Sequence, residues 1–499
     1  MLKERIEGWY KVAILNFVLF APYFNAKVYP AFSLDKIIVL LCITFIASML
    51  LSRVIYCVVA VTLVVVNIIC LHIAFHWGLL AFNERINIGL ESPPLEMFEY
   101  LKTYCSTIDV FIIIHAVLCL WGIWHIARNR KPSTYWMRAL SAIPFVLILL
   151  PITANPRALS LPIISLPYEI YDQPVRHQRL ERRNALISSM PERNLNCRAD
   201  FKNIVIVIGE SASADHNPLY GYTHAGKSGL SGEGFTTFNA ISGANQTRLS
   251  IPMMLTSASV DNFDDFYKSE SILTELKSCG YATYWISNQP QSGRWEDNVS
   301  SLGKEADISV YLTANAAADG NHFDEELVEQ VNLLNNGDEK KAFIVHLAGS
   351  HFDYHRRYPK SFASQEGPMI DIYNSTVRYT DTVLTSLFKS FDKGSLLFVY
   401  ASDHGEVFDH EIFGHGFIPS YQDEYRVPLI AWSSNQGQLK KLQDYAKGKV
   451  INTESFNDIL DYLIGLESTP AKVSFSNVVL QASSSHLVSY SELRDAKNL

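Results

Sequence analysis

Long apolar stretches fill the first third of the chain, and shorter apolar runs separated by polar segments follow after about residue 200. A helix needs about 20 apolar residues to cross the hydrocarbon core of a bilayer. Five stretches approach that length and predict a transmembrane domain of five helices over residues 1–154: approximately 12–32, 37–52, 54–76, 108–127 and 138–154.

Basic residues indicate how these helices are oriented. Lys and Arg cluster before the first stretch (residues 3–11), between the second and third (Arg53) and between the fourth and fifth (128–138), whereas the loop at 77–107 is mainly acidic. Because cytoplasmic loops carry the excess of Lys and Arg, we expect the N-terminus in the cytoplasm. Five spans then place everything after about residue 155 outside, in the periplasm if this is a bacterial inner membrane.

Residues 155–200 have the character of a linker along the membrane surface. They contain several prolines and a charged run, QRLERRNAL at 178–186, which predicts an exposed helix. Only two of the seven cysteines, Cys197 and Cys279, lie beyond residue 155. They can form a disulfide if this part is extracytoplasmic, although their spacing alone does not establish a pair.

The pattern after residue 200 predicts an α/β domain over 201–499. Near-continuous apolar runs of this length are typical of strands that are buried on both faces. Segments with helical spacing lie between them, and this alternation predicts a mostly parallel sheet. The predicted strands are 203–209, 281–287, 341–348, 395–402 and 427–434, and the predicted helices are 270–280, 323–334 and 368–391.

Polar side chains follow three of the predicted strands. The first ends in Glu210, the third is followed by His351, and the fourth ends in Asp403-His404. The carboxyl ends of parallel strands meet at one edge of a sheet, where ligands bind. Carboxylates and imidazoles suit Zn²⁺, and a set without cysteine favours a catalytic over a structural site. The net charge of −8 predicts no basic surface for nucleic acid.

Four motifs make the chain resemble the lipid-dependent phosphoethanolamine transferases of the alkaline phosphatase/sulfatase superfamily, which modify lipid A or the core of lipopolysaccharide. The resemblance covers nearly the whole chain, from the apolar stretches to the α/β domain. Its motifs are VIGESASADHNPLYGY (207–222), ISGANQTRLSIPMML (241–255), HLAGSHFDYHRRYP (346–359) and SDHGE…GHG (402–416).

The resemblance implies a zinc ion and roles for six residues. A zinc-activated threonine, Thr247, attacks the phosphorus of phosphatidylethanolamine and releases diacylglycerol, and a sugar hydroxyl then takes the phosphoethanolamine from it. A helix that starts near Ser250 is expected to point its amino end at the phosphate. The implied zinc ligands are Glu210, Thr247, Asp403 and His404, and the implied phosphoryl-binding or proton-transfer residues are His351 and His415.

The chain departs from the family pattern around the nucleophile. Family members often have two cysteines there, and Ser242 and Met253 stand in their places. This favours a core sugar or another periplasmic acceptor over lipid A. Six further residues match family positions near the donor headgroup: Ser92 and Glu96 in the loop between spans three and four, and Asn288, Gln289, Ser292 and Arg294 after the second strand.

Other functions remain open from the sequence. A sulfatase would use the Ser250-Ile251-Pro252 segment, but Met254 stands where its arginine is expected. A phosphoglycerol transferase acting on a periplasmic glycan shares the five spans and the threonine, and a phosphodiesterase differs only in using water as the acceptor. An adhesion or assembly module that kept the fold is expected to have lost ligands, and all six candidates are present.

Overall fold

The chain forms two compact units in the computed structural model. The structure describes several positions between Cys57 and His72, then 105–129, 162–191 and 193–495, with gaps at 225, 290, 292–297, 313–321, 410–411, 418–419 and 482–485.

In the first unit, helix α6 (Thr107–Asn129) corresponds to the predicted fourth span. Within the described residues, its segment Thr107–His125 is the one helix that is long and apolar enough to cross a membrane. Large apolar side chains such as Phe111 and Trp121 are exposed on it, as expected of a helix that faces lipid. The other predicted spans lie largely outside the described residues, so the count of five stays a prediction.

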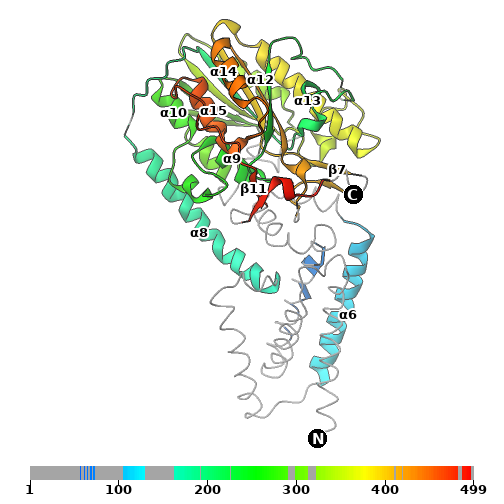
Figure 1. The fold of residues 1–499 in the computed structure, drawn as a ribbon. Coiled ribbons are helices and arrows are strands. Elements are labelled where there is room, and N and C mark those ends of the chain that lie inside the picture. The colour runs from blue at the N-terminus through cyan, green and yellow to red at the C-terminus, as the bar shows by residue number, and fades with distance from the viewer. Residues whose placement is uncertain are drawn as a thin grey trace. The chain divides into compact units, whose positions relative to one another are not determined.

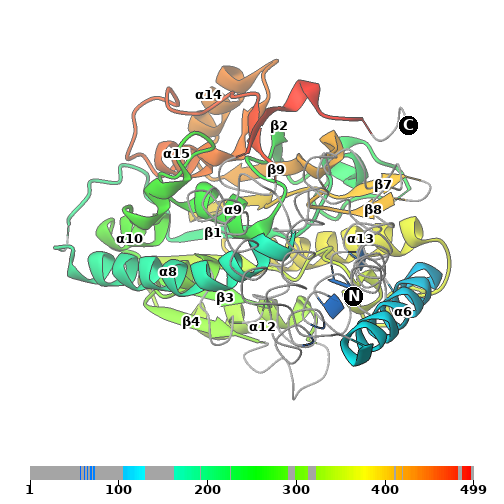
Figure 2. The ribbon, with the colours of Figure 1, turned by 90° about the horizontal axis from the view of Figure 1, so that it is seen from below.

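The second unit is built on an eight-stranded sheet with the order β10-β2-β9-β6-β1-β5-β3-β4, several strands of which are labelled in Figure 2. All strands run parallel to their neighbours except β9, which is antiparallel to both β2 and β6, so the sheet is mixed. The strands are β1 (Asn203–Gly209), β2 (Thr236–Ile241), β3 (Ala282–Ser287), β4 (Ile308–Tyr311), β5 (Lys341–His346), β6 (Leu396–Ser402), β9 (Arg426–Ser433) and β10 (Ile451–Asn452).

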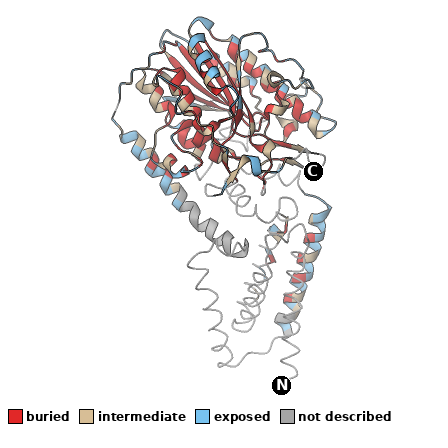
Figure 3. Ribbon diagram, viewed as in Figure 1, coloured by how far each residue is buried: buried red, intermediate tan, exposed pale blue. Residues whose placement is uncertain are grey.

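All five predicted strands are present, and the central ones are buried along their whole length (Figure 3). Alternate residues of β1 serve two cores. Ile204, Ile206 and Ile208 face one cluster of apolar side chains, and Val205 and Val207 face another. Burial on both faces explains why the run NIVIVIG is continuous rather than alternating.

Helices cover both faces of the sheet (Figure 1). Side chains from α9, α10, α14 and α15 belong to the first core, and those from α12 and α13 belong to the second. The bounds are α9 (Thr247–Leu255), α10 (Ile272–Ser278), α11 (Asn298–Gly303), α12 (Glu325–Leu334), α13 (Met369–Lys389), α14 (Gln436–Ala446) and α15 (Phe456–Leu463). Two hairpins lie apart from the main sheet: β7 (Val407–Asp409) with β8 (Ile412–Gly414), and β11 (Val478–Leu480) with β12 (Leu487–Ser489).

The charged run before the α/β domain forms the end of helix α8 (Pro162–Ser189). The helix is present as predicted, but it is not exposed on all sides. Arg183 is completely buried, and its guanidinium donates to Oε1 of Glu305 at 2.6 Å and to the carbonyl oxygen of Phe266 at 2.8 Å. The disulfide that the sequence left open is also present, because Cys197 is bonded to Cys279 at the end of α10.

Candidate active site

The register between β1 and β6 brings the first two candidate ligands together. Gly209 pairs with Ser402, so the next residues, Glu210 and Asp403, leave the sheet side by side. The loop after β5 closes over them from the neighbouring strand. Gly349 has φ +54°, and a Cβ on it would lie 2.8 Å from the carbonyl oxygen of Glu210. This close approach explains why a glycine follows the strand at this position.

Three buried ligand atoms converge at this edge of the sheet. Glu210, Asp403 and His404 each offer one ligand atom, all within 4.8 Å of one another. Nε2 of His404 lies 3.4 Å from Glu210 and 3.5 Å from Asp403. The Nδ1–H of His404 donates to the carbonyl oxygen of Gly405 at 2.9 Å, which leaves the lone pair of Nε2 directed at the two carboxylates.

The hydrogen bonds of Asp403 fit a metal ligand. Its Oδ1 accepts from the backbone N–H groups of Ser211 and His404, at 3.1 and 2.7 Å. Its Oδ2 is buried, and no described residue donates a hydrogen bond to it. A buried carboxylate oxygen without a donor is costly unless a cation neutralises it. The donor set of two carboxylates and an imidazole suits zinc.

The electrostatics of Glu210 lead to the same conclusion. Burial, followed by the neighbouring Asp403 carboxylate, raises the pKa of Glu210 well above its usual range. Two carboxylates this close in a buried site resist ionising together unless a cation is present. A divalent ion bound by Glu210, Asp403 and His404 would stabilise both charges at once.

Thr247 lies at the first position of α9, three residues before the predicted helix start near Ser250. Its hydroxyl donates to Oε2 of Glu210 at 3.1 Å and lies 3.3 Å from Nε2 of His404. The hydroxyl therefore borders the three ligand atoms, at the end of a helix where backbone N–H groups favour an anion. The same helix contains Pro252, which has no N–H to donate to the carbonyl oxygen of Arg248 four residues earlier. The side chain of Asn298 donates to that oxygen instead.

Ser250 is placed differently from Thr247. It is 1% exposed, and its hydroxyl points back to the carbonyl oxygen of Thr247 at 3.5 Å. Ser242, where the family has a cysteine, is fully buried and donates to the carbonyl oxygens of Ala244 and Asp403. These hydrogen bonds connect the nucleophile loop to the ligand loop in a chain that has no cysteines here.

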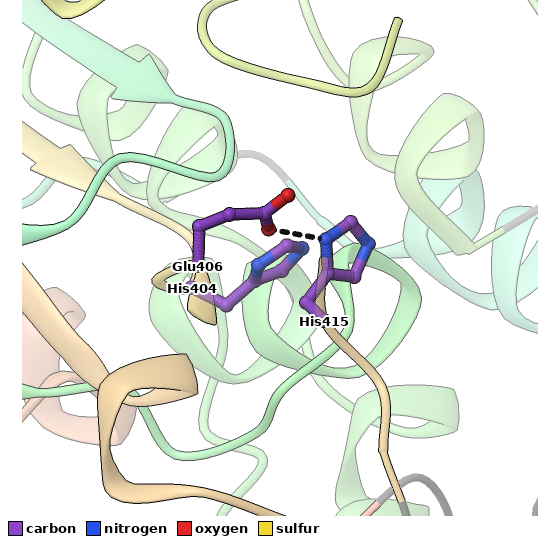
Figure 4. Close-up of side chains that lie close together, drawn as sticks. All are labelled: His404, Glu406 and His415. Atoms are coloured by element: carbon purple, nitrogen blue, oxygen red, sulfur yellow. Dashed lines mark hydrogen bonds and ion pairs between the residues drawn. The ribbon is translucent and has the colours of Figure 1, made fainter. Parts of the chain in front are cut away.

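His415 forms a pair with a residue that lies outside the predicted set (Figure 4). Its Nδ1–H donates to Oε2 of Glu406 at 2.7 Å, and the hydroxyl of Tyr354 donates to the other oxygen of that carboxylate. The ring centroids of His404 and His415 are 4.1 Å apart. Glu406 is 1% exposed, so solvent screens its interaction with the imidazole of His415 little. His404, Glu406 and His415 also form a second group with ligand atoms close enough for a metal.

The ring of His351 also lies near His415, with the two ring centroids 5.8 Å apart. Its Nδ1–H donates to the carbonyl oxygen of Phe352 at 2.6 Å. Burial, then the charges of Arg357 and His415, hold the pKa of His351 well below its usual range, so it is neutral at physiological pH. Arg357 also fixes this loop by donating to the carbonyl oxygen of His351 at 2.8 Å.

Two of the six predicted headgroup residues, Gln289 and Asn288, are among the described residues. Gln289 reaches the site, where its amide nitrogen lies 3.4 Å from Oε2 of Glu210. Asn288 is 4% exposed and donates to Asp324 at 2.8 Å; this carboxylate also accepts from the N–H groups of Ala348 and Gly349. Asn288 thus helps to hold the loop that carries His351. The other four candidates, Ser92, Glu96, Ser292 and Arg294, lie outside the described residues.

Two acids of the site, Glu406 and Asp324, are missing from the residues predicted by sequence. Glu406 stands within the SDHGE motif, and its position nine residues before His415 was the available signal. Asp324 lies at the start of α12, 27 residues before His351, and resembles any helix-capping aspartate.

Known proteins share these features. The sequence profile of the sulfatase family matches residues 202–465, which is more than half of the chain. The phosphoethanolamine transferase EptC of Escherichia coli (strain K12) is 25% identical over 409 residues, covering 72% of this chain and 70% of EptC. The Kdo(2)-lipid A phosphoethanolamine 7''-transferase of Salmonella typhimurium is 28% identical over 262 residues, covering 48% and 45%. The chain spans about half the length of several curated relatives that it matches.

Two solved structures share the fold. The C-terminal periplasmic domain of EptC from Escherichia coli, in complex with Zn, has a TM-score of 0.53 at 23% identity, covering 61% of this chain and 97% of that chain. The integral membrane protein lipooligosaccharide phosphoethanolamine transferase A (EptA) from Neisseria meningitidis has a TM-score of 0.62 at 17% identity, covering 92% and 94%. The α/β domain expected from the sequence is thus confirmed, with β9 as an antiparallel strand in a sheet that is otherwise parallel. The chain belongs to the sulfatase family, and the predicted resemblance to its phosphoethanolamine transferases is confirmed.

Proposed function

We propose that this protein transfers phosphoethanolamine from phosphatidylethanolamine to a sugar of lipopolysaccharide, through a covalent intermediate on Thr247. One observation carries the proposal. The Thr247 hydroxyl borders three buried ligand atoms from Glu210, Asp403 and His404, next to the Glu406–His415 pair. A nucleophile, a cation site and a carboxylate-assisted base are the parts that phosphoryl transfer through an enzyme-bound intermediate needs.

Zinc held by Glu210, Asp403, His404 and Thr247 would lower the pKa of the threonine hydroxyl and neutralise charge on the phosphoryl oxygens. The rest of the reaction is assigned to side chains. The oxygen of Thr247 bonds to phosphorus while the bond to diacylglycerol breaks, and the proton of Thr247 passes through His415 to the leaving oxygen. The acceptor hydroxyl then gives its proton to His415 and attacks phosphorus, the bond to Thr247 breaks, and His415 returns that proton to Thr247.

His415 is the better of the two histidines for this proton transfer. The Glu406 carboxylate accepts its Nδ1–H and stabilises the imidazolium form, so Nε2 is the nitrogen that we assign to exchanging the proton. His351 has a pKa that burial holds well below its usual range, so it accepts protons poorly near neutral pH. We assign His351 to accepting a hydrogen bond from the substrate or orienting it.

The location we propose is a bacterial inner membrane with the α/β domain in the periplasm. Two observations support it. Helix α6 has the length and apolarity of a membrane span, and the Cys197–Cys279 disulfide favours an oxidising compartment. A lipid donor explains why the enzyme is joined to a membrane segment. The names of the relatives, which refer to lipid A and phosphoethanolamine, support both the transferred group and the acceptor class.

The test compares lipopolysaccharide from cells that carry the wild-type chain with lipopolysaccharide from cells that carry Thr247→Ala. Each sample is separated into lipid A and core, and both fractions are analysed by mass spectrometry. We expect a phosphoethanolamine mass in one fraction of the wild-type sample only. Ser250→Ala is the matched control, because its buried hydroxyl is excluded from the proposed chemistry, and it should retain the modification. The proposal fails if Thr247→Ala retains the mass, or if a phosphoglycerol mass takes its place in the wild type.

A further inference from the structure

One buried carboxylate that has no part in the proposed chemistry contacts the loops that carry the reacting residues. Glu424 ends a short 3-10 turn, Gln422–Glu424, just before β9. Its side chain is completely buried. It neither binds the metal nor moves a proton in the proposed reaction.

The first contact is with the nucleophile loop. Asn245, two residues before Thr247, is fully buried and donates from its side-chain nitrogen to Oε2 of Glu424 at 2.8 Å. The same nitrogen also lies 3.0 Å from the hydroxyl of Ser420. The segment that contains Glu424 thus holds Asn245, and through it the start of α9.

The second contact is with the loop that carries the proposed base. The backbone N–H of Phe417, two residues after His415, donates to the same Oε2 at 3.0 Å. The other oxygen accepts from the backbone N–H of Tyr421 at 2.8 Å. One carboxylate oxygen therefore joins the Thr247 loop directly to the His415 loop.

The third contact involves the backbone of Glu424 and the ligand loop. Its carbonyl oxygen accepts from the N–H of Gly405, the residue after His404, at 2.8 Å. A Cβ on Gly405 would lie 2.3 Å from the carbonyl oxygen of Asp423, so only glycine allows the two segments to approach this closely. Three loops of the site, those that carry Thr247, His404 and His415, are therefore fixed to one residue.

The side chain of Glu424 acts here as an acceptor. Asn245 and Phe417 donate N–H groups to one of its oxygens and Tyr421 donates to the other. These donors favour the carboxylate form and oppose burial, which raises the pKa of Glu424. In glutamine, an NH₂ group would replace one of the two carboxylate oxygens. The N–H donors that this oxygen accepts would then face another donor. Replacement by glutamine is therefore a small change in shape with a specific cost in hydrogen bonding.

We propose that Glu424 is a positioning residue that sets the distance between Thr247 and His415. The inference rests on the proposed function and adds a residue that touches neither substrate nor metal. Residues that hold reacting groups in place commonly change activity by about 10- to 100-fold when they are replaced.

The experiment uses the full chain, purified in detergent and loaded with zinc, with phosphatidylethanolamine as the donor and lipopolysaccharide as the acceptor. Glu424→Gln should lower kcat by about 10- to 100-fold while zinc content and the KM for the donor stay within about twofold. Glu424→Asp, which keeps an acceptor, should fall between this variant and the wild type. Glu275→Gln is the matched control, because its side chain also accepts an N–H, from Asn457 at 3.2 Å, and it lies on α10, outside the loops that carry Thr247, His404 and His415.

A double-mutant cycle separates positioning from general stability. Asn245→Ala and Glu424→Gln break the same hydrogen bond. The double variant should therefore be little less active than the less active of the two single variants. Wild-type kcat in folded Glu424→Gln, fully additive losses, or a loss that follows zinc content and the midpoint of thermal unfolding would each overturn the inference. An inactive wild type would instead overturn the proposed function, and this inference with it.

Discussion

Two regions of the α/β domain bury a pair of carboxyl groups, and they are built for different purposes. Glu210 and Asp403 leave adjacent strands next to His404 and Thr247. Glu275 on α10 and Asp461 on α15 form the other pair, with Asn457 donating to Glu275 at 3.2 Å. Among the described residues, no further histidine, cysteine or acid brings a third ligand atom into that second pair.

The difference shows what turns acidic pairs into metal sites. Burial, followed by the neighbouring Asp461, raises the pKa of Glu275 to about 8, and burial raises that of Asp461 to about 6, so a shared proton satisfies them near neutral pH. Asp403 and Asp461 each have one buried oxygen without a described donor. At the strand ends, however, an imidazole lone pair and a hydroxyl also point at the carboxylates. Only a cation satisfies all of those groups together.

Asp403→Asn should have the largest effect. It keeps the shape of the side chain but removes the charge that faces His404, so zinc content should fall from about one ion per chain to nearly none. Transfer should fall by about 10³-fold or more, the range seen when a charge-neutralising group is lost from phosphoryl transfer. Metal analysis and a transfer assay on the detergent-purified chain measure both. Zinc retained at the wild-type level would show that the comparison is mistaken.

Glu406→Gln should have the next largest effect, because it separates proton transfer from metal binding. Without the carboxylate, the imidazolium of His415 loses its partner, and kcat should fall by about 10²-fold with zinc content unchanged. Tyr354→Phe is the control, since it removes only the hydrogen bond to the other oxygen. Equal effects of the two variants would argue against a base role for His415.

Metal removal distinguishes the two pairs by stability. At a zinc concentration about 1,000 times Kd, binding stabilises the folded state by about 4 kcal/mol. For a domain of this size class, chelation should lower the midpoint of thermal unfolding by roughly 10 °C. Glu275→Gln should show the same shift as the wild type, and Asp403→Asn should show none. A chelator effect on all three chains would place the metal elsewhere.

The last effect, no larger than that of metal removal, concerns pH. The pKa of Glu275 is about 8 in the folded chain against an ordinary value of 4.5, so the folded state keeps a proton that the unfolded state has lost. Its stabilising contribution is complete below pH 4.5 and disappears as the pH rises through 8, with a slope of up to about 1.4 kcal/mol per pH unit. Thermal midpoints of Glu275→Gln should therefore fall less between pH 5 and 8 than those of the wild type. Parallel curves would refute the shared proton.

Much of the site could be predicted from the sequence because strand burial determines it. The runs NIVIVIG and SLLFVYAS are apolar throughout, so they had to be central strands, and the residues after them had to meet at one edge. The burial pattern of these two strands is therefore enough to bring Glu210, Asp403 and His404 together. The predicted helix after Thr247 is also present, displaced by three residues.

The rest depended on partners that no local pattern identifies. The antiparallel direction of β9 is set by its pairing with β2 and β6, which leaves no mark on the run VPLIAWSS. A buried Glu406 or Glu424 has the same sequence appearance as a solvated glutamate, because its hydrogen-bond donors come from other segments. Arg183 was predicted on an exposed helix, and its burial follows from Glu305, 122 residues later.

The most direct measurement is a mass spectrum of the peptide that contains Thr247, taken after the zinc-loaded chain meets phosphatidylethanolamine without an acceptor. We predict a phosphoethanolamine adduct on Thr247 that disappears when lipopolysaccharide is added, and no adduct in Asp403→Asn. A modified lipopolysaccharide formed while Thr247 never carries the adduct, or an adduct on Ser250 instead, would contradict the covalent mechanism at this site.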